Sequence, residues 1–140
     1  TVETVEDIVV VVETDDGRVG CGEAPATAVI TGDTHGSIIE AITRVIRPRL
    51  IGQDISNLNQ ITQIIQNSLE RNYSAKAAVE IAVYDLWGQL YEAPLYRMLG
   101  GGDPVITTAT VDRMVHHSII ITIQGPSWRL HQSRRLNAPQ

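Results

Sequence analysis

Phenylalanine is absent from this 140-residue sequence and aromatic residues make up only 4% of it, so a core must be built from aliphatic side chains. Cys21 is the only cysteine, which excludes a disulfide framework. The longest apolar runs, Ile8–Val12 and Ile119–Ile121, fall far short of the about 18 residues that a membrane-spanning helix needs. The hydrophobic content of 43% nevertheless exceeds that of disordered chains and indicates one globular domain.

The first residues have neither the basic nor the apolar region of a signal peptide. We therefore expect a cytoplasmic protein with no membrane partner. The sequence starts with Thr1 rather than Met, which indicates that it begins inside a longer chain.

Charge is distributed unevenly along the sequence. Residues 1–112 contain all 16 acidic residues and seven basic ones, whereas residues 113–140 contain four arginines and no acidic residue. This change indicates a boundary near residue 112. The tail is either a basic arm or a segment that does not belong to the preceding domain, and we expect it to bind no nucleic acid because too few basic residues are present.

A β-hairpin is predicted at the start of the sequence. Its strands are Val5–Thr14, which includes five consecutive β-branched residues, and Arg18–Glu23. Gly17 can take the positive φ that the connecting turn requires. A loop of about ten residues, Ala24–Asp33, follows, and loops of that length inside a compact domain are often functional.

Helices are predicted after the loop, because apolar residues recur at three- and four-residue spacing behind capping residues. The fold class is therefore α+β, an antiparallel hairpin followed by a bundle of three helices. The predicted helices are His35–Leu50 after Thr34, Leu58–Leu69 after Ser56 or Asn57, and Ala75–Tyr91 after Ser74, with a short turn at Leu95–Leu99.

Two blocks of the sequence resemble the N-terminal capping domain of the enolase superfamily, of the mandelate racemase/muconate lactonizing enzyme type. In the first block, Gly22–Thr34 (Gly-Glu-Ala-Pro-Ala-Thr-Ala-Val-Ile-Thr-Gly-Asp-Thr) resembles the dipeptide epimerases. The second block consists of Ser74–Gln89 and the following Pro94–Gly101. Together the blocks extend the resemblance over about residues 1–111.

The resemblance implies that the hairpin is the remnant of a three-stranded sheet and that the domain caps a barrel, which performs the chemistry. In the intact family enzyme, carboxylates of the barrel hold Mg²⁺, and two lysines remove and return the α-proton of a dipeptide substrate through an enediolate. The loop Pro25–Asp33 would form a wall of the substrate pocket. The substrate-binding residues that the resemblance implies are Thr27, Ile30, Thr31 and Thr110.

The catalytic barrel is expected to be missing from this sequence. A barrel of this kind needs at least about 200 residues, Lys76 is the only lysine, and no Asp or Glu follows Asp112. No catalytic or metal-binding residue is therefore assigned, and we expect the chain alone to bind no cofactor and to be inactive. A missing barrel domain would leave apolar surface uncovered, so self-association is also expected.

The resemblance divides the sequence into three parts. Residues 1–103 form the capping domain, 104–111 begin the first barrel strand, and 112–140 form a non-matching tail that is expected to be irregular. A frameshift or gene-fragment junction near Asp112–Arg113 is the hypothesis for this break.

Several single residues have a structural and a functional interpretation. Glu23 is interpreted as structural rather than as an acid or base, and Cys21 as a small buried hydrophobe. Asp33 is interpreted as a capping group, and Tyr84, Asp85 and Trp87 are interpreted as residues that pack and hydrogen-bond between helix and barrel.

The predicted function is that of a substrate-specificity cap of a Mg²⁺-dependent dipeptide-epimerase-like enzyme, an isomerase. Two alternatives remain open. One is a relative of muconate cycloisomerase or o-succinylbenzoate synthase, and the other is a stand-alone interaction module with a basic tail.

Overall fold

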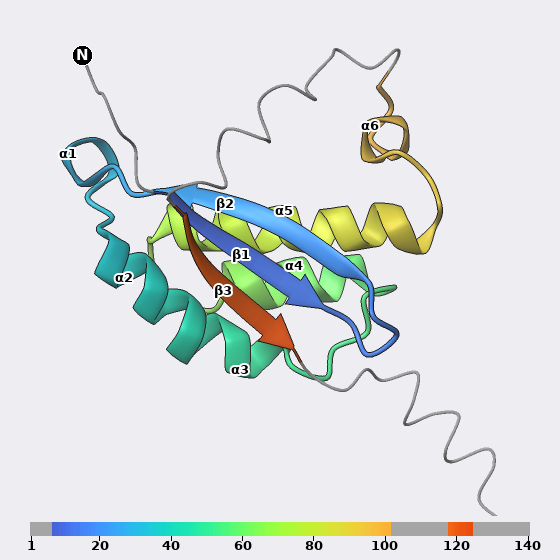
Figure 1. Ribbon diagram of the computed structural model, residues 1–140, viewed down its shortest axis with the longest axis horizontal. Coiled ribbons are helices and arrows are strands. Elements are labelled where there is room, and N and C mark those ends of the chain that lie inside the picture. The colour runs from blue at the N-terminus through green and yellow to red at the C-terminus, as the bar shows by residue number, and fades with distance from the viewer. Residues whose placement is uncertain (1–6, 102–117, 125–140) are drawn as a thin grey trace, which may run out of the picture.

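The computed structural model describes residues 7–101 and 118–124, and in this part three strands form one sheet with helices on one of its faces (Figure 1). The strands are β1 (Asp7–Glu13), β2 (Val19–Pro25) and β3 (Ser118–Gln124), in the order β2-β1-β3. Strand β1 is antiparallel to β2 and parallel to β3. The α+β class and the hairpin are confirmed.

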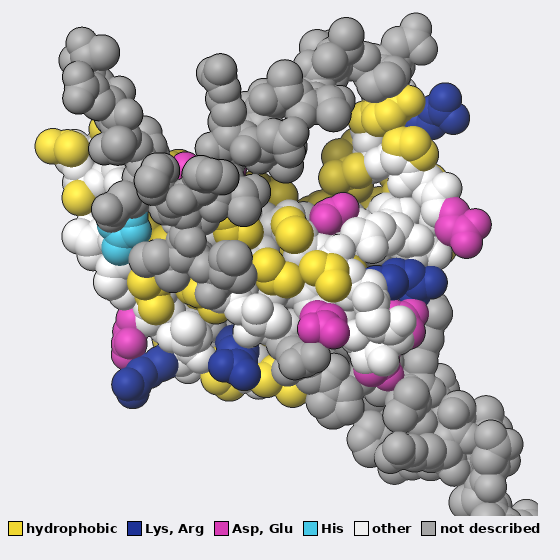
Figure 2. Space-filling view, in the orientation of Figure 1, with side chains coloured by type: hydrophobic (Ala, Val, Ile, Leu, Met, Phe, Trp, Pro, Cys, Tyr) yellow, Lys and Arg dark blue, Asp and Glu magenta, His cyan; other side chains and the backbone are white. Residues whose placement is uncertain are grey.

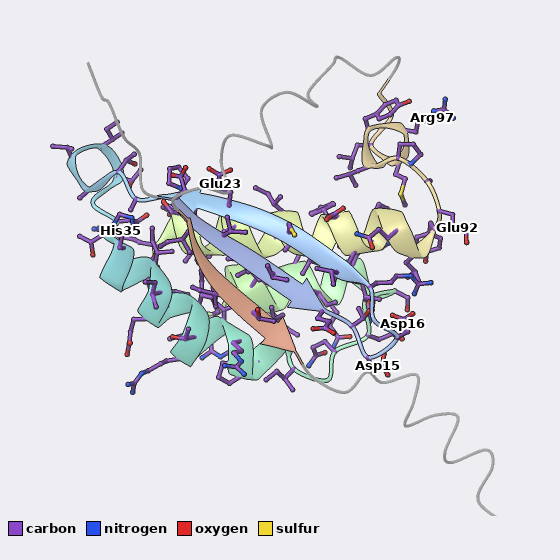
Figure 3. The ribbon with its side chains drawn as sticks, in the orientation of Figure 1. Asp15, Asp16, Glu23, His35, Glu92 and Arg97 are labelled. Carbon is purple, nitrogen blue, oxygen red and sulfur yellow. The ribbon has the colours of Figure 1, made fainter. Side chains whose placement is uncertain are left out.

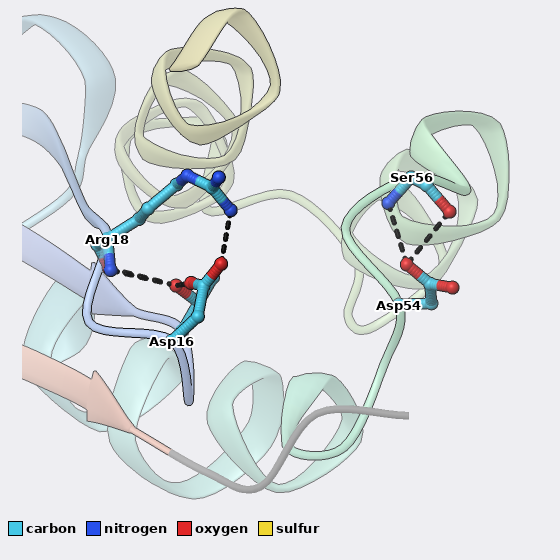
Figure 4. Close-up of polar contacts among 5 residues, drawn as sticks. Asp16, Arg18, Asp54 and Ser56 are labelled. Carbon is cyan, nitrogen blue, oxygen red and sulfur yellow. Dashed lines mark hydrogen bonds and ion pairs between the residues drawn. The ribbon is translucent and has the colours of Figure 1, made fainter. Parts of the chain in front are cut away.

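The hairpin turn lies where the sequence places it. Gly17 has φ +85°, and the Thr14 N–H donates to the Arg18 carbonyl at 3.0 Å. Asp16 forms an ion pair with Arg18 across the turn (Figure 4). The Thr14 hydroxyl, and after it the Arg18 guanidinium, lower the pKa of Asp16. These short-range contacts fix the register in which Val11 lies opposite Cys21.

Strand β3 corrects the prediction that residues 112–140 are irregular and that the sheet has only two strands. Residues 118–124 pair with β1 along its full length, from Asp7 opposite Ser118 to Glu13 opposite Gln124. Ile121 and Ile123 are 8% and 3% exposed and belong to the core. Composition did not predict this strand, because a run of β-branched residues forms a strand only where it can pair with the edge of a sheet.

The predicted helices are confirmed, with small changes at their ends. The first predicted helix is continuous from His35 to Leu50 but contains a π-helical segment in its middle. The second is shorter than expected, ending at Gln66. The elements are α1 (Ala28–Thr31), α2 (His35–Glu40), η1 (Ala41–Ile46), α3 (Arg47–Leu50), α4 (Leu58–Gln66), α5 (Tyr73–Leu90) and α6 (Leu95–Met98).

Helix α5 packs directly on β2, because two glycines of that strand face it. A Cβ atom at Gly22 would lie 1.8 Å from the Ala78 carbonyl oxygen, and one at Gly20 would lie 2.2 Å from that of Ala82. Only glycine allows the backbones to approach this closely. The core between sheet and helices is aliphatic, as predicted, and its largest fully buried side chains are Ile8, Ile38, Ile42, Ile46, Ile65 and Leu86.

Two basic side chains bind backbone carbonyls at the last residue of α4 and just beyond it. Lys76, only 5% exposed, donates from Nζ to the Gln66 carbonyl at 2.9 Å, and Arg49 donates from Nη1 to the Ser68 carbonyl. Positive groups stabilise a helix C-terminus through its unpaired carbonyls and its dipole. The single lysine of the sequence therefore has a structural role in this domain.

No helix in the described part of the chain has the length and apolar character needed to cross a membrane.

Candidate functional site

The loop after β2 contains one helical turn, α1, which the sequence did not predict. The N–H groups of Ile30 and Thr31 both donate to the Thr27 carbonyl at 2.9 Å, and Gly32 ends the turn with φ +82°. The Thr31 hydroxyl donates back to the Thr27 carbonyl at 3.2 Å and accepts from the Asp33 N–H at the same distance. The loop is thus a folded unit held by its own threonines.

The tip of this loop is apolar and exposed. Val29 has a relative exposure of 102% and Ile30 of 83%, the two highest values among the large hydrophobic side chains of the described residues. Side chains of this type normally lie inside a protein. Their exposure indicates a surface that contacts another molecule or another part of a protein.

The far end of the loop is tied to the start of α5 by side chains from three segments. Asp33 accepts a hydrogen bond from the Ser74 hydroxyl at 2.8 Å. Asn72 donates from Nδ2 to the Ser37 carbonyl at 3.0 Å, and Ser37 and Thr34 form a capping box at the start of α2. Figure 3 shows this end of the domain, with His35 beside α1 and Glu23 at the end of β2.

This arrangement confirms one capping assignment and corrects another. Thr34 caps α2 as predicted. Ser74 does not cap α5, because the helix begins at Tyr73 instead of the predicted Ala75 and follows Asn72 in the left-handed conformation (φ +50°). Ser74 instead bonds to Asp33, whose side chain therefore tethers the loop to α5.

Glu23 lies on the outer face of the sheet close to Asp7. Burial raises the pKa of the Glu23 carboxyl, and a hydrogen bond and the negative charge of Asp7 raise it further. The two residues are diagonal neighbours in the β1–β2 register, in which Asp7 lies opposite Pro25 and Glu23 opposite Val9. The pair is a partly desolvated carboxyl couple at the base of the loop.

Cys21 is exposed, which corrects the interpretation of a buried hydrophobe. Side chains alternate along a strand, and Gly20 and Gly22 occupy the face toward α5, so Cys21 points away from the core. Burial, and the nearby charge of Asp85, raise the pKa of its thiol. These effects disfavour the thiolate, so Cys21 is a poor nucleophile at neutral pH.

The opposite end of the domain has a hollow between the hairpin turn and the segment that precedes α4. Its lining includes Asp15, Asp16, Arg18 and Asp54 together with apolar residues. Two of the carboxylates there have partners within the chain: Asp16 pairs with Arg18, and Asp54 accepts from the Ser56 N–H and hydroxyl at 2.9 and 2.8 Å (Figure 4). Asp16 and Asp54 are thus engaged within the chain rather than directed toward a ligand.

Within residues 7–101 and 118–124, no three His, Cys, Asp or Glu side chains come together in a way that could hold a metal ion. The residues present here therefore do not fit a Mg²⁺ site.

Three of the four implied substrate-binding residues, Thr27, Ile30 and Thr31, lie together on the α1 turn, and Thr110 lies outside the described residues. The sequence analysis did not assign Val29 or Asn72 to the site, and it gave Ser74 the role of a helix cap rather than that of a partner of Asp33. Val29 has a signal in the sequence, because it is a large apolar residue within a predicted loop. Asn72 and Ser74 have none, because their partners are 35 and 41 residues away along the chain.

Residues 1–100 match the family described as the mandelate racemase/muconate lactonizing enzyme, N-terminal domain. This match covers well over half of the chain. The chain belongs to this family.

Its relatives within the mandelate racemase/muconate lactonizing enzyme group include several epimerases. The L-Ala-D/L-Glu epimerase of Bacillus subtilis is 50% identical over 101 residues, which are 72% of this chain and 28% of that protein. The hydrophobic dipeptide epimerase of Enterococcus faecalis is 38% identical over 112 residues, or 79% of this chain and 31% of that protein.

The fold agrees with the same group. A substrate-liganded structure of the Bacillus subtilis epimerase superposes with a TM-score of 0.60 at 40% identity, covering 69% of this chain and 33% of that one. The dipeptide epimerase of Enterococcus faecalis, in complex with Mg and the dipeptide L-Leu-L-Tyr, gives a TM-score of 0.60 at 38% identity, covering 65% and 25%. The chain thus spans about a third or less of the length of these relatives.

Proposed function

We propose that this domain is the substrate-specificity cap of a dipeptide-epimerase-like isomerase. The α1 turn, with Thr27, Ile30 and Thr31, covers the substrate, and the neighbouring Val29 extends its apolar surface. The whole enzyme inverts the α-carbon of a dipeptide by removing its α-proton, forming an enediolate and returning a proton to the opposite face. The residues that move the proton lie outside this domain.

The observation that carries the proposal is the exposed apolar tip of a loop that is otherwise firmly held. Val29 and Ile30 project from a turn that Thr27, Thr31 and Ser74 fix in place. A preorganised apolar surface binds a partner at low entropic cost and excludes water from it. The family match over residues 1–100 includes this loop, and the 50% identity to an L-Ala-D/L-Glu epimerase supports the choice of substrate class.

The loop itself supplies no acid, base or nucleophile of the required kind. Residues 26–32 contain no ionisable side chain, and Glu23 at its base faces Asp7 on the outer side of the sheet. The proposed role is therefore binding and positioning. Mg²⁺, which the solved Enterococcus faecalis relative holds, would be bound by residues outside the described part.

A muconate cycloisomerase-like or o-succinylbenzoate synthase-like activity is the competing proposal, since those enzymes form carbanionic intermediates with the same type of cap. The apolar residues of α1 suit either kind of substrate. Side-by-side assays with dipeptides and with muconate distinguish the two.

A chimera tests the proposal directly. The matched region of the Bacillus subtilis epimerase is replaced by residues 1–100 of this chain, and epimerisation of L-Ala-L-Glu is measured with Mg²⁺. We expect an active chimera, no activity from the 140-residue chain alone, and an increase of at least about tenfold in KM for Ile30→Asp, about 1.4 kcal/mol of lost binding.

Gln63→Lys, at an exposed position of α4 remote from the loop, is the matched control and leaves KM unchanged. A chimera that is folded but inactive on dipeptides contradicts the proposed function. An active chimera whose KM is unchanged by Ile30→Asp contradicts the role of the loop.

A further inference from the structure

The two outer edges of the sheet differ in how far other elements of the domain cover them. At the β2 edge, the Cys21 N–H donates to Asp85 Oδ2 at 3.0 Å, and the Val19 carbonyl accepts from Gln89 Nε2 at 2.8 Å. Asp85 and Gln89 are one turn apart on α5 and therefore lie on the same side of that helix. They occupy backbone groups that an additional strand would need, so this edge is blocked.

The β3 edge lies at the other end of the sheet. Strand β3 has a strand neighbour only on the side of β1, and its main contact among the described elements is also with β1 (Figure 1). Helix α5, by contrast, packs most extensively on β2. An edge strand of this kind has backbone N–H and C=O groups directed away from the sheet that can pair with another strand.

The sequence of β3 favours such pairing. It reads Ser-Ile-Ile-Ile-Thr-Ile-Gln, in which five of the seven residues are β-branched and none is charged or proline. Monomeric proteins usually protect an edge strand with Lys, Pro or a bulge. Strand β3 contains neither of these two residues, and its pairing with β1 is continuous over all seven positions.

We propose that β3 pairs in antiparallel fashion with β3 of a second copy of this chain, about a two-fold axis at Ile121. In this register Ser118 lies opposite Gln124 of the second copy and Ile120 opposite Thr122. The result is one continuous sheet with three strands from each copy. Pairs of this kind contact each other through the same surface and close upon themselves.

A second copy suits this edge better than a charged partner. The chain has a net charge of −5, but the seven residues of β3 are neutral, so the paired strands meet without like charges opposite one another. On the inner face, Ile121 and Ile123 already belong to the core, and the two-fold axis extends that row of isoleucines from one copy to the next.

The blocked β2 edge limits the assembly. After two β3 strands have paired, both free ends of the sheet are β2 edges, which Asp85 and Gln89 cover. Growth therefore stops at the dimer. Residues 118–124 also lie beyond the residues 1–100 that match the family, so this interface is a property of this chain rather than of the shared domain.

The mass of the full chain in solution tests the proposal. Light scattering coupled to size exclusion is measured from about 1 µM to about 1 mM, the range that covers interfaces of modest affinity. We expect twice the chain mass of 15.3 kDa at the upper concentrations. A mass of one chain throughout the range overturns the proposal.

Charge variants at Thr122 locate the interface. Thr122 is exposed, so Thr122→Lys and Thr122→Glu leave the core intact, and in the proposed register the two copies of position 122 are diagonal neighbours on one face. We expect each variant alone to have the mass of one chain, because like charges then meet. An equimolar mixture of the two is expected to regain the mass of two chains.

The control Gln63→Lys makes on α4 the same change of charge as Thr122→Lys and is expected to remain a dimer. Circular dichroism verifies that every variant keeps the secondary structure of the parent chain. Thr122 variants that stay dimeric like the control, or a mixture that fails to pair, overturn the assignment of the interface to β3.

Discussion

The strands β2 and β3 form the two edges of one sheet, yet they are held by opposite means. Strand β2 lies tightly against α5 through Gly20 and Gly22, and its outer edge is covered by two polar side chains of that helix. Strand β3 comes from a distant part of the sequence and is joined to the domain mainly through β1. An edge position in a sheet therefore does not by itself decide how accessible a strand is.

The outer face of the sheet shows a related difference. Figure 2 shows hydrophobic side chains across the middle of this face, where Val9 and Val11 of β1 are half-buried and Val19 of β2 is 44% exposed. Glu23 and Asp7 lie on the same face near the loop. The face thus combines an apolar centre with a carboxyl pair at one end.

The largest effect is expected where β2 meets α5. Gly22→Ala places a Cβ 1.8 Å from a backbone oxygen that no rotamer change can move, so the strand must separate from the helix. We expect a loss of more than about 4 kcal/mol in the free energy of unfolding. Denaturant titration measures it, and Gly36→Ala, where the nearest atom is 4.0 Å away, is the matched control. Equal stability of the two variants would contradict the close packing.

The contribution of β3 to the core is the next largest. Ile123→Ala removes a side chain that is 3% exposed, and we expect the free energy of unfolding to fall by about 3 kcal/mol. Thr122→Ala, at the adjacent exposed position, should change it by less than about 0.5 kcal/mol. If both substitutions leave denaturant unfolding unchanged, β3 does not belong to the folded sheet and the contrast between the edges disappears.

Removal of the side chains that cover the β2 edge should make this edge as available for strand pairing as the β3 edge. The double change Asp85→Ala and Gln89→Ala removes two exposed hydrogen bonds, which costs about 1 kcal/mol in the free energy of unfolding. It also frees the edge for pairing, so light scattering should detect species larger than the dimer. The control pair Gln63→Ala and Glu70→Ala also removes one amide and one carboxylate, at exposed positions elsewhere, and should do neither.

The smallest effect concerns Glu23. Its pKa is raised in the folded domain, so protonated Glu23 favours folding at acid pH, and this contribution is lost as the pH rises through the folded pKa. Glu23→Gln should therefore be more stable than the parent at neutral pH, by less than about 1 kcal/mol because solvent screens a half-buried group.

Unfolding measured between pH 3 and pH 7 should show that this advantage disappears below the ordinary glutamate pKa of about 4.5. In an Asp7→Asn background the stability advantage of Glu23→Gln should be smaller, since the Asp7 charge contributes to the raised pKa of Glu23. If the stability advantage of Glu23→Gln were independent of pH, the raised pKa of Glu23 beside Asp7 would be contradicted.

Much of the fold could be predicted, because the signals are local. Gly17 marked the hairpin turn, Thr34 marked the start of α2, and the isoleucine spacing of His35–Leu50 marked its buried face. In the candidate site, the loop Ala24–Asp33 was likewise predicted from its composition, whereas the substrate-binding roles of Thr27, Ile30 and Thr31 stay a prediction. The α1 turn was not predicted, because a single helical turn depends on the hydrogen bonds of Thr27 and Thr31 rather than on periodicity.

The sequence by itself determined the aliphatic core, the order of hairpin and helices and the identity of the apolar residues in the loop, since each depends on neighbours within a few positions. Tertiary structure alone decided that Ser74 bonds to Asp33, that Cys21 faces outward and that residues 118–124 complete the sheet. These outcomes depend on which segments meet in space. A free edge beside Asp7–Glu13 turned a run of isoleucines into a strand, and no local pattern specifies its partner.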